Sequence, residues 1–215
     1  MKNRLSRIGI FGASGFSREA ADVCYDLGCD KIIFIDINPT EQEYFGFPVV
    51  SERKIPELMR ERFVFIIGIG DNKLRQEVFK KYSNLEYPNI IHPTATMGYK
   101  QKESMENLKG NIITSGVRFT NNIQFGNFGI FNLNCTVGHD CILEDFINIA
   151  PGATISGNVH IKKGVYVGTN AAIIQGESIE NKITIGTFAI IGAGAVVTKD
   201  ILHDSIAVGV PARVK

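Results

Sequence analysis

Four histidines are the side chains in this sequence best suited to acid–base chemistry, because an unperturbed imidazole titrates near neutral pH. They are His92, His139, His160 and His203. His139 lies in the segment TVGHDC at residues 136–141, between two apolar positions. An imidazole there could take a proton from an attacking nucleophile, or it could be a solvent-facing residue without a chemical role. The residues alone leave both interpretations open.

A glycine-rich segment near the N-terminus could bind a phosphate group. Residues 12–15 read Gly-Ala-Ser-Gly and lie between a strand-like run and a helical pattern. Backbone amides at such a turn, together with the N-terminus of the helix, favour an anion. The full dinucleotide fingerprint G-x-G-x-x-G is absent, because Ser14 and Ser17 stand at two of its glycine positions. A nicotinamide cofactor is therefore not expected, and a tight turn without a ligand is the alternative interpretation.

The first half of the chain alternates between strand-like and helical patterns. The expected strands are 7–11, 31–36 and 63–68, and the expected helices are 16–27 and 71–82. Asp71 or Asn72 would cap the second helix. Residues 51–60 form another helix candidate, provided that the helix starts late enough to tolerate Pro56. This order predicts a small parallel α/β sheet, a truncated Rossmann-like arrangement, over residues 1–92.

Two loops of this sheet would border the same crevice as the glycine turn. Asp36 ends the second strand, where a carboxylate could hydrogen-bond a ribose or a base. Residues 68–72, Gly-Ile-Gly-Asp-Asn, follow the third strand. Because the carboxyl ends of parallel strands meet at one edge of a sheet, we expect these loops to line one crevice with the glycine turn.

After Pro93 the sequence follows a period of six residues. Every sixth residue from Ile113 to Val197 is large and aliphatic or aromatic, and the residue four positions further along is mostly small or medium and apolar. Such a hexapeptide forms one face of a triangular coil, with the large residue inside the prism and the small one near a corner. Three faces make an 18-residue turn, and successive turns stack as parallel strands about 4.8 Å apart. We therefore predict a parallel β-helix over residues 93–215.

Two places interrupt this repeat. Glu177 occupies a position that is otherwise small and apolar, and we expect a distorted or bulged turn there. Residues 100–109 are charged and without repeat character, which indicates a loop or an imperfect first turn. The fifteen hexads correspond to five turns. The alternative fold, a β-sandwich of short strands, would show turn signals at wider and uneven spacing.

The coil would place His139 at the third position of its hexad, outside the prism and on a wall that a neighbouring subunit could cover. One turn further along the chain, Gly157 would lie directly above His139 on the same face. A glycine at this point would let a ligand approach the backbone closely. A corner glycine that serves only the turn is the alternative.

Composition excludes several classes of function. The formal net charge of +1 gives no overall field for nucleic acid or a membrane surface. With 44% hydrophobic and 21% charged residues, the composition is ordinary for a soluble globular protein. The apolar stretches are too short to span a bilayer. The four cysteines form no C-x-x-C pair, and no signal-peptide pattern precedes the first strand. We expect reduced thiols in a cytoplasmic protein.

The repeat resembles that of a known group, the hexapeptide-repeat acyltransferases. Hexads IGTFAI at 185–190 and IGAGAV at 191–196 follow its pattern, and VGVPAR at 208–213 resembles its C-terminal segment. Joined to IFGASGF at 10–16, the repeat resembles the bacterial sugar acetyltransferases that include nucleotide-linked amino-sugar N-acetyltransferases and sialic acid O-acetyltransferase-like proteins. This resemblance covers essentially the whole chain. It implies a left-handed β-helix and an acetyl-CoA-dependent acyltransferase that works as a homotrimer, with active sites between subunits.

The resemblance also implies roles for single residues. His139 would be the general base, Asp140 its orienting carboxylate, and the Gly157 amide an oxyanion donor. Acetyl-CoA would lie in the groove between subunits, contacting Gly157, later turns of the coil and Arg213. A nucleotide-linked sugar would bind near the glycine turn. Its expected contacts are Gly12, Ser14, Gly15, Asp36, Gly70, Asn72 and Asn132.

The chain departs from the resembled family at two positions. Many relatives carry a histidine where this chain has Phe16, and some carry a second histidine where it has Asn148. A polar contact from residue 16 and a relay of two histidines are therefore not carried over.

The expected activity is N-acetylation of a nucleotide-linked amino-deoxysugar by direct attack of the amine, because no cysteine sits beside His139 in the outward register. The nearest alternative is O-acetylation of a sialic acid-type sugar. A zinc hydrase like the γ-type carbonic anhydrases would need three zinc-binding histidines, and the four scattered histidines form no convincing trio, so no metal is expected. A catalytically silent nucleotide-binding scaffold is the remaining alternative. The sequence does not identify the sugar or the nucleotide.

Overall fold

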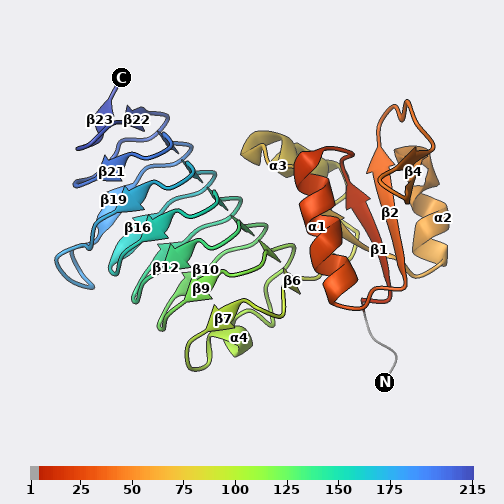
Figure 1. Cartoon of the computed structure of the whole chain (residues 1–215), viewed down its shortest axis with the longest axis horizontal. Helices are drawn as coiled ribbons and strands as arrows, with labels where there is room; N and C mark the ends of the chain where they lie inside the picture. The colour runs from red at the N-terminus through yellow and green to blue at the C-terminus, as the bar shows by residue number, and fades with distance from the viewer. Residues whose placement is uncertain (1–4) are drawn as a thin grey trace.

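The computed structural model describes residues 5–215 and consists of a small α/β part and a long coil of short strands (Figure 1). The α/β part lies along the side of the coil, from its first turns to the turn of Gly164 and Val165, and the last turns extend away from it toward the C-terminus. Among residues 5–215, no helix has the length and apolar character needed to cross a membrane.

A five-stranded sheet forms the centre of the α/β part, in the order β3-β4-β2-β1-β5. Its strands are β1 (Arg7–Phe11), β2 (Lys31–Asp36), β3 (Glu43–Tyr44), β4 (Phe47–Ser51) and β5 (Val64–Ile67). Neighbouring strands are parallel except for β3 and β4. The apolar runs of β1, β2 and β5 are buried, as expected for parallel strands with helices on both faces. The strand order reverses between β1 and β5, which opens a crevice at their carboxyl ends.

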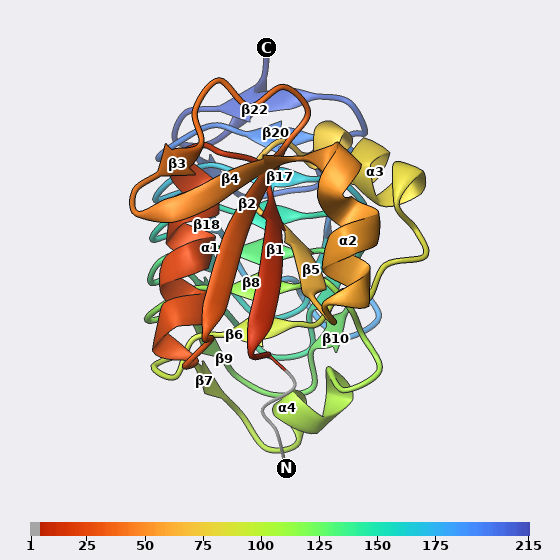
Figure 2. The ribbon, with the colours of Figure 1, turned by 90° about the vertical axis from the view of Figure 1, so that its right-hand side faces the viewer.

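Three helices and a short 3-10 turn cover this sheet. They are α1 (Gly15–Asp26), the turn Glu52–Lys54, α2 (Ile55–Arg60) and α3 (Asn72–Lys81). Helix α1 packs between the sheet and the coil, because its Ala20 and Val23 belong to one apolar cluster with Ile112 and Ile130 of the coil. Ile55 of α2 belongs to the cluster on the opposite face. Figure 2 shows the sheet in front of the coil, whose strands run across it.

The sequence pattern predicts most of these elements. The strands expected at 7–11 and 31–36 and the two expected helices are confirmed. Pro56 is tolerated because it lies in the first turn of α2, where its missing N–H has no intrahelical partner to lose. The pattern does not predict β3 and β4, because β4 is only partly buried and contains Pro48, which has no backbone N–H to donate.

Three mainly parallel sheets wind around the coil as the faces of a prism. Face 1 contains β6 (Ile90–Ile91), β8 (Ile112–Ile113), β11 (Ile130–Phe131), β14 (Asn148–Ile149), β17 (Tyr166–Val167), β20 (Ile190–Ile191), β22 (Ile206–Val208) and the antiparallel β23 (Arg213–Val214). Face 2 contains β7 (Thr96–Met97), β9 (Arg118–Phe119), β12 (Thr136–Val137), β15 (Thr154–Ile155), β18 (Ala172–Ile173) and β21 (Val196–Val197). Face 3 contains β10 (Gln124–Phe125), β13 (Ile142–Leu143), β16 (Val159–Ile161) and β19 (Ile183–Ile185).

The predicted six-residue register fills the interior of the coil with one buried apolar cluster. Ile179 is the exception, because its side chain is 55% exposed. Ile161 pairs with Ile185 rather than with Ile179, so the hexad around Glu177 leaves the coil as a loop. The bulge expected at Glu177 is confirmed, and the interior position expected for Ile179 is wrong.

The coil starts with an irregular turn. Strand β6 already pairs with β8, so the ladder of face 1 begins a little before residue 93. Helix α4 (Gln101–Ser104) takes the place of a face 3 strand in this turn. The Gln101 side chain accepts a hydrogen bond from the Ile123 amide at 2.8 Å, which joins the helix to the next turn. The imperfect first turn expected around residues 100–109 is therefore confirmed.

The C-terminal segment, residues 201–214, closes the other end of the coil on all three faces. Ile201 bridges to Ile185 on face 3, and the Val196 N–H donates to the Gly209 carbonyl at 3.0 Å on face 2. On face 1 the segment folds back as the antiparallel hairpin of β22 and β23.

Arg75 of α3 joins the α/β part to the corner of the coil between faces 3 and 1. Its side chain is only 1% exposed and has no carboxylate within ion-pair distance among residues 5–215. Instead, the guanidinium donates to the carbonyl oxygens of Phe128 at 3.0 Å and of Phe146 and Ile147 at 2.9 Å each. It also donates to the Ile69 carbonyl at 2.9 Å, on the loop that follows β5. Burial lowers the pKa of this guanidinium.

Candidate active site

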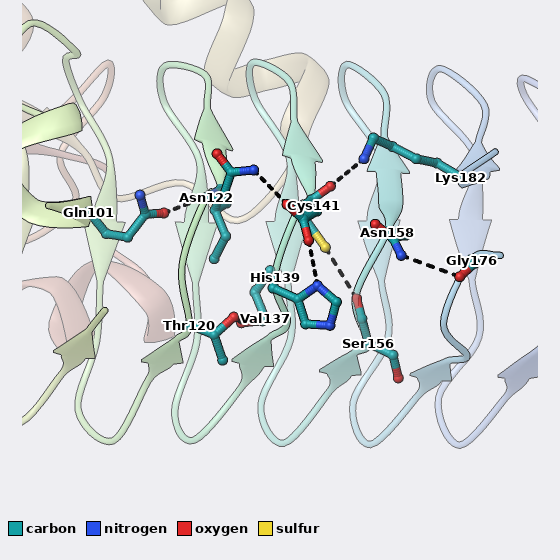
Figure 3. Close-up of polar contacts among 12 residues, drawn as sticks. Gln101, Thr120, Asn122, Val137, His139, Cys141, Ser156, Asn158, Gly176 and Lys182 are labelled. Carbon is teal, nitrogen blue, oxygen red and sulfur yellow. Dashed lines mark hydrogen bonds and ion pairs between the residues drawn. The ribbon is translucent and has the colours of Figure 1, made fainter. Parts of the chain in front are cut away.

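His139 lies at the corner between faces 2 and 3, in the segment that links β12 to β13 (Figure 3). The residue after it, Asp140, has a left-handed backbone conformation with a φ of 60°. The same conformation recurs at Asn122 on the turn below and at Asn158 on the turn above. The corner is therefore a regular feature of the coil, and each turn presents its corner side chains in register with the next.

The His139 ring is held by the next residue in the chain. Its Nδ1 lies 2.6 Å from Asp140 Oδ2. An ionised carboxylate only accepts hydrogen bonds, so the neutral ring carries its proton on Nδ1. The Nε2 atom has no partner within residues 5–215, and the side chain is 45% exposed. A neutral His139 thus presents a free lone pair at Nε2, as a general base requires.

The Asp140 carboxylate accepts a second hydrogen bond besides the one from the histidine. Asn122 Nδ2 donates to its other oxygen, Oδ1, at 2.5 Å. Lys182 Nζ lies 2.5 Å from the Asp140 backbone carbonyl oxygen (Figure 3). The Asn122 amide and, next, the His139 ring hold the pKa of the Asp140 carboxyl below its ordinary value, and the Lys182 charge acts in the same direction. At neutral pH the carboxyl is therefore ionised and accepts the Nδ1–H bond.

Gly157 lies against the His139 ring on the turn above. A Cβ atom added to Gly157 would stand 2.6 Å from both Cε1 and Nε2 of the ring, so a larger residue would displace the histidine. The Gly157 backbone N–H donates to no acceptor in the described part of the chain. This places a glycine with a free amide beside Nε2, in agreement with the predicted stacking. Such an amide can donate to an oxyanion on a ligand at Nε2.

Cys141 is the thiol nearest to His139 in the chain, but it is buried inside the prism. Its Sγ donates to the Ser156 carbonyl oxygen at 3.2 Å. Burial raises the pKa of the Cys141 thiol to about 11, so it is protonated at neutral pH. A buried, protonated thiol is not a nucleophile.

A groove of about 660 Å³ lies further along the same corner. The loop at residues 174–177 and 181–183 forms one wall, and residues 198–200 with Leu202 and Val214 form the other. Lys182 lines this groove and also contacts Asp140, so the groove borders the His139 site. Arg213 is exposed next to Val214 but does not line the groove.

A second cavity of about 410 Å³ opens at the glycine turn. Gly12, Ser14 and Asp36 line it, as the sequence predicts, together with one side of α3. The left-handed φ of 101° at Gly12 favours glycine there and bends the chain from β1 into the turn. Three lining residues have no signal in the sequence, because they come from distant segments: Glu52, Lys81 and Tyr82. Glu52 accepts hydrogen bonds from both of the others at 2.6 Å.

Gly15, Gly70 and Asn72 do not line this cavity. Gly15 is the first residue of α1. Gly70 and Asn72 border a different hollow, of about 480 Å³, between α3 and face 1. The Asn72 amide already donates to the carbonyl oxygens of Gly164 at 2.9 Å and Val165 at 3.0 Å, and so joins α3 to the coil. Contacts from these three residues to a substrate stay predictions.

Asn132 lies at the corner between faces 1 and 2, not at the corner of His139. Its amide donates to Asn148 Oδ1 at 3.0 Å, and Asn148 donates to the Gly70 carbonyl at 2.9 Å. Both asparagines are buried. The structure therefore assigns Asn132 to a chain of hydrogen bonds that reaches the α/β part, and its contact with a substrate stays a prediction.

The other three histidines each bind a carboxylate away from this corner. His92 contacts Asp26 at 2.7 Å, His160 contacts Glu144 at 2.7 Å, and His203 contacts Asp204 at 3.2 Å. Residues 5–215 contain no group of three or more histidine, cysteine, aspartate or glutamate side chains able to hold a metal ion.

Known proteins share both parts of this architecture. Residues 7–82 match the PglD N-terminal domain family. Over 179 residues the chain is 33% identical to a GDP-perosamine N-acetyltransferase of Escherichia coli O157:H7, covering 78% of each chain. The chain belongs to the hexapeptide-repeat nucleotide-amino-sugar N-acetyltransferase family.

Two solved structures show the likeness over the whole length of this family member. One is a histidine-to-asparagine mutant of perosamine N-acetyltransferase from Caulobacter crescentus in complex with CoA and GDP-perosamine. It is 27% identical with a TM-score of 0.85 and covers 97% of this chain and 96% of its own. The other is the acetyltransferase domain of PglB from Neisseria gonorrhoeae FA1090 in complex with acetyl coenzyme A. It is 27% identical with a TM-score of 0.86 and covers 98% of this chain and 99% of its own.

These comparisons confirm the predicted family and the predicted fold, an α/β part with a left-handed β-helix. They also confirm the predicted enzyme class. This protein is an acetyl-CoA-dependent acyltransferase, and acetyl-CoA is its co-substrate.

Proposed function

We propose that this enzyme transfers the acetyl group of acetyl-CoA to the amine of a nucleotide-linked amino-deoxysugar. The observation that carries the proposal is the setting of His139, whose Nδ1 is bound to Asp140 while Nε2 has no partner among the described residues. Gly157, whose amide has no acceptor in the described part of the chain, lies against the same side of the ring. The similarity to a GDP-perosamine N-acetyltransferase supports an amino sugar on a nucleotide as the acceptor.

In this mechanism the sugar amine attacks the thioester carbonyl carbon, and His139 Nε2 takes a proton from the amine nitrogen as the C–N bond forms. The carbonyl oxygen becomes an oxyanion, to which the Gly157 N–H donates. The C–S bond then breaks, and His139 returns the proton to the departing thiolate. The products are the acetylated sugar and free CoA. Asp140 stabilises the imidazolium between these two steps.

We infer that a second subunit completes each site and that the enzyme is a homotrimer. In one chain the α/β part packs on the start of face 1 and on the corner between faces 3 and 1. His139 lies at a different corner, between faces 2 and 3. A neighbour packed beside that corner would cover the exposed side of His139 and enclose acetyl-CoA between the two subunits. Gly157 and Arg213 would contact acetyl-CoA there.

We further infer that the nucleotide occupies the cavity at the glycine turn. Gly12, Ser14 and the N-terminus of α1 would receive the diphosphate, and Asp36 would bind the ribose. Phe11 and Tyr82 stack at 5.2 Å between ring centroids and give this cavity an apolar wall for a base.

A thiol-release assay tests the proposed function. Acetyl-CoA would be offered with GDP-, UDP- and dTDP-linked amino sugars to the wild type and to His139→Ala. We expect turnover with at least one amino sugar and a kcat lower by about 10²–10⁴-fold in the variant. Turnover with hydroxyl acceptors alone would replace the proposal by sugar O-acetylation. Undiminished activity of the variant would refute His139 as the base.

The same preparation tests the shared site by sedimentation. A trimer at micromolar concentration is the expected result. A stable monomer that retains full activity would refute a site shared between subunits.

A further inference from the structure

The Asp140 carboxylate divides its two oxygens between two partners. Oδ2 accepts from His139 Nδ1 at 2.6 Å, and Oδ1 accepts from Asn122 Nδ2 at 2.5 Å. Asn122 lies on the turn below, 18 residues earlier, at the same corner. Figure 3 shows the Asn122 amide directed toward the segment between His139 and Cys141. The orientation of the carboxylate toward the histidine is therefore shared with a residue from another turn.

The backbone of Asp140 is fixed without Asn122. Its N–H donates to the Asn121 carbonyl at 3.2 Å, and its carbonyl oxygen accepts from Lys182 Nζ at 2.5 Å. The freedom that remains is rotation of the Asp140 side chain. The Lys182 ammonium, which lies on the carbonyl of the same residue, attracts the carboxylate as well. Without the Asn122 amide, the Asp140 side chain would populate two orientations, one toward His139 and one toward Lys182.

We propose that Asn122 is a positioning residue for the general base. Its amide holds the Asp140 carboxylate toward His139, which keeps the imidazole proton on Nδ1 and leaves Nε2 free. This inference rests on the proposed role of His139 as the base. Asn122 itself touches neither substrate in this scheme, and it acts only through Asp140.

A purely structural role for Asn122 is the competing explanation, because asparagine tolerates the left-handed conformation that this corner requires. Asn122 has a φ of 53°, and Asn170, exposed at the corner between faces 1 and 2, has a φ of 55°. Glycine adopts this conformation without strain but offers no amide side chain. Asn122→Gly therefore removes the hydrogen bond and leaves the turn intact, and Asn170→Gly is the matched control.

Two measurements test the proposal. The first is steady-state kinetics, in which we expect Asn122→Gly to lower kcat by about 10- to 100-fold, as the loss of a charge-assisted hydrogen bond does. Both KM values should stay within about twofold, because neither substrate loses a contact. Asn170→Gly should match the wild type in kcat. Full kcat in Asn122→Gly would overturn the proposal.

The second measurement needs no substrate. In protein labelled with ¹⁵N-histidine, the ring signals of His139, assigned by comparison with His139→Asn, report which nitrogen carries the proton. We expect one tautomer with Nδ1–H in the wild type and in Asn170→Gly, and a mixture in Asn122→Gly. An unchanged tautomer in Asn122→Gly would overturn the proposal. The two proposals fail in different ways: a fully active His139→Ala would refute His139 as the base, whereas an inactive His139→Ala with an unchanged tautomer in Asn122→Gly would overturn only the role of Asn122.

Discussion

At the scale of single residues, the site depends on which nitrogen of His139 carries the proton. Asp140 accepts a hydrogen bond from Nδ1, so the nitrogen left free is the one beside Gly157. A side chain at position 140 that can donate would favour the opposite tautomer, with the proton on Nε2. The ring would then keep its place but lose its lone pair at Nε2, the atom that we propose as the base.

The Asp140→Asn variant tests this dependence. We expect kcat to fall by about 10²–10⁴-fold, because the asparagine amide can donate to Nδ1.

The wild type should also be more stable than the Asp140→Asn variant at neutral pH. The lowered pKa of Asp140 contributes stability above the ordinary aspartate pKa of about 3.9, and this contribution is lost as the pH falls through the folded-state value.

Urea unfolding of both proteins at about pH 7 and about pH 3 measures that contribution. The advantage of the wild type should be present at the higher pH and shrink at the lower one. An advantage that does not change with pH would show that the carboxylate is not held as described.

The spacing of 18 residues between stacked positions explains which residues of the site could be predicted from the sequence. It places Gly157 against His139, and the same step backward from Asp140 leads to Asn122, so the spacing contains both contacts. Lys182 contacts Asp140 although the two residues do not follow the 18-residue spacing, because the loop before Lys182 lies outside the repeat. The fold of the loop brings such a residue to the site, and no regular spacing in the sequence predicts it.

At the scale of elements, one hexad of the sequence repeat forms a loop instead of a face of the coil. Ile173 and Ile179 are the same residue type in the same register, yet Ile173 is in the interior and Ile179 is 55% exposed. A periodic pattern cannot distinguish them, because both satisfy it. The pairing of Ile161 with Ile185 decides which hexad is left out.

Substitution of these two isoleucines by alanine should have unequal effects. Ile173→Ala leaves a void in the packed interior and should lower the free energy of unfolding by about 2–5 kcal/mol. Ile179→Ala removes an exposed side chain and should change it by less than about 0.5 kcal/mol. Chemical denaturation of the two variants beside the wild type measures both values. Equal losses would place Ile179 in the core.

At the scale of the whole molecule, a buried arginine connects the two parts. Arg75 donates to carbonyl oxygens of the coil and of the loop after β5, and no carboxylate among residues 5–215 forms an ion pair with it. The connection depends on backbone acceptors, which every sequence has. This explains why the sequence pattern predicts the two parts but not how they are joined.

Arg75→Leu should therefore destabilise the enzyme. Each buried carbonyl oxygen left without a donor costs about 1–3 kcal/mol, so we expect a loss of at least about 3 kcal/mol. Arg60→Leu, at the exposed end of α2, is the control and should stay within about 0.5 kcal/mol of the wild type. Denaturant unfolding compares the three proteins. Equal stability of Arg75→Leu and the control would contradict this account of the connection.

A parallel ladder that simply stopped would leave a row of unpaired N–H and C=O groups on each face, open to the first turn of another molecule. Residues 201–214 occupy these positions, bridging to Ile185, pairing with Val196 and ending in the hairpin of β22 and β23. An antiparallel strand cannot continue a coil in which every turn runs the same way. We therefore expect the closing segment to prevent end-to-end stacking of these molecules into fibres, so that any association between them uses the side walls of the coil.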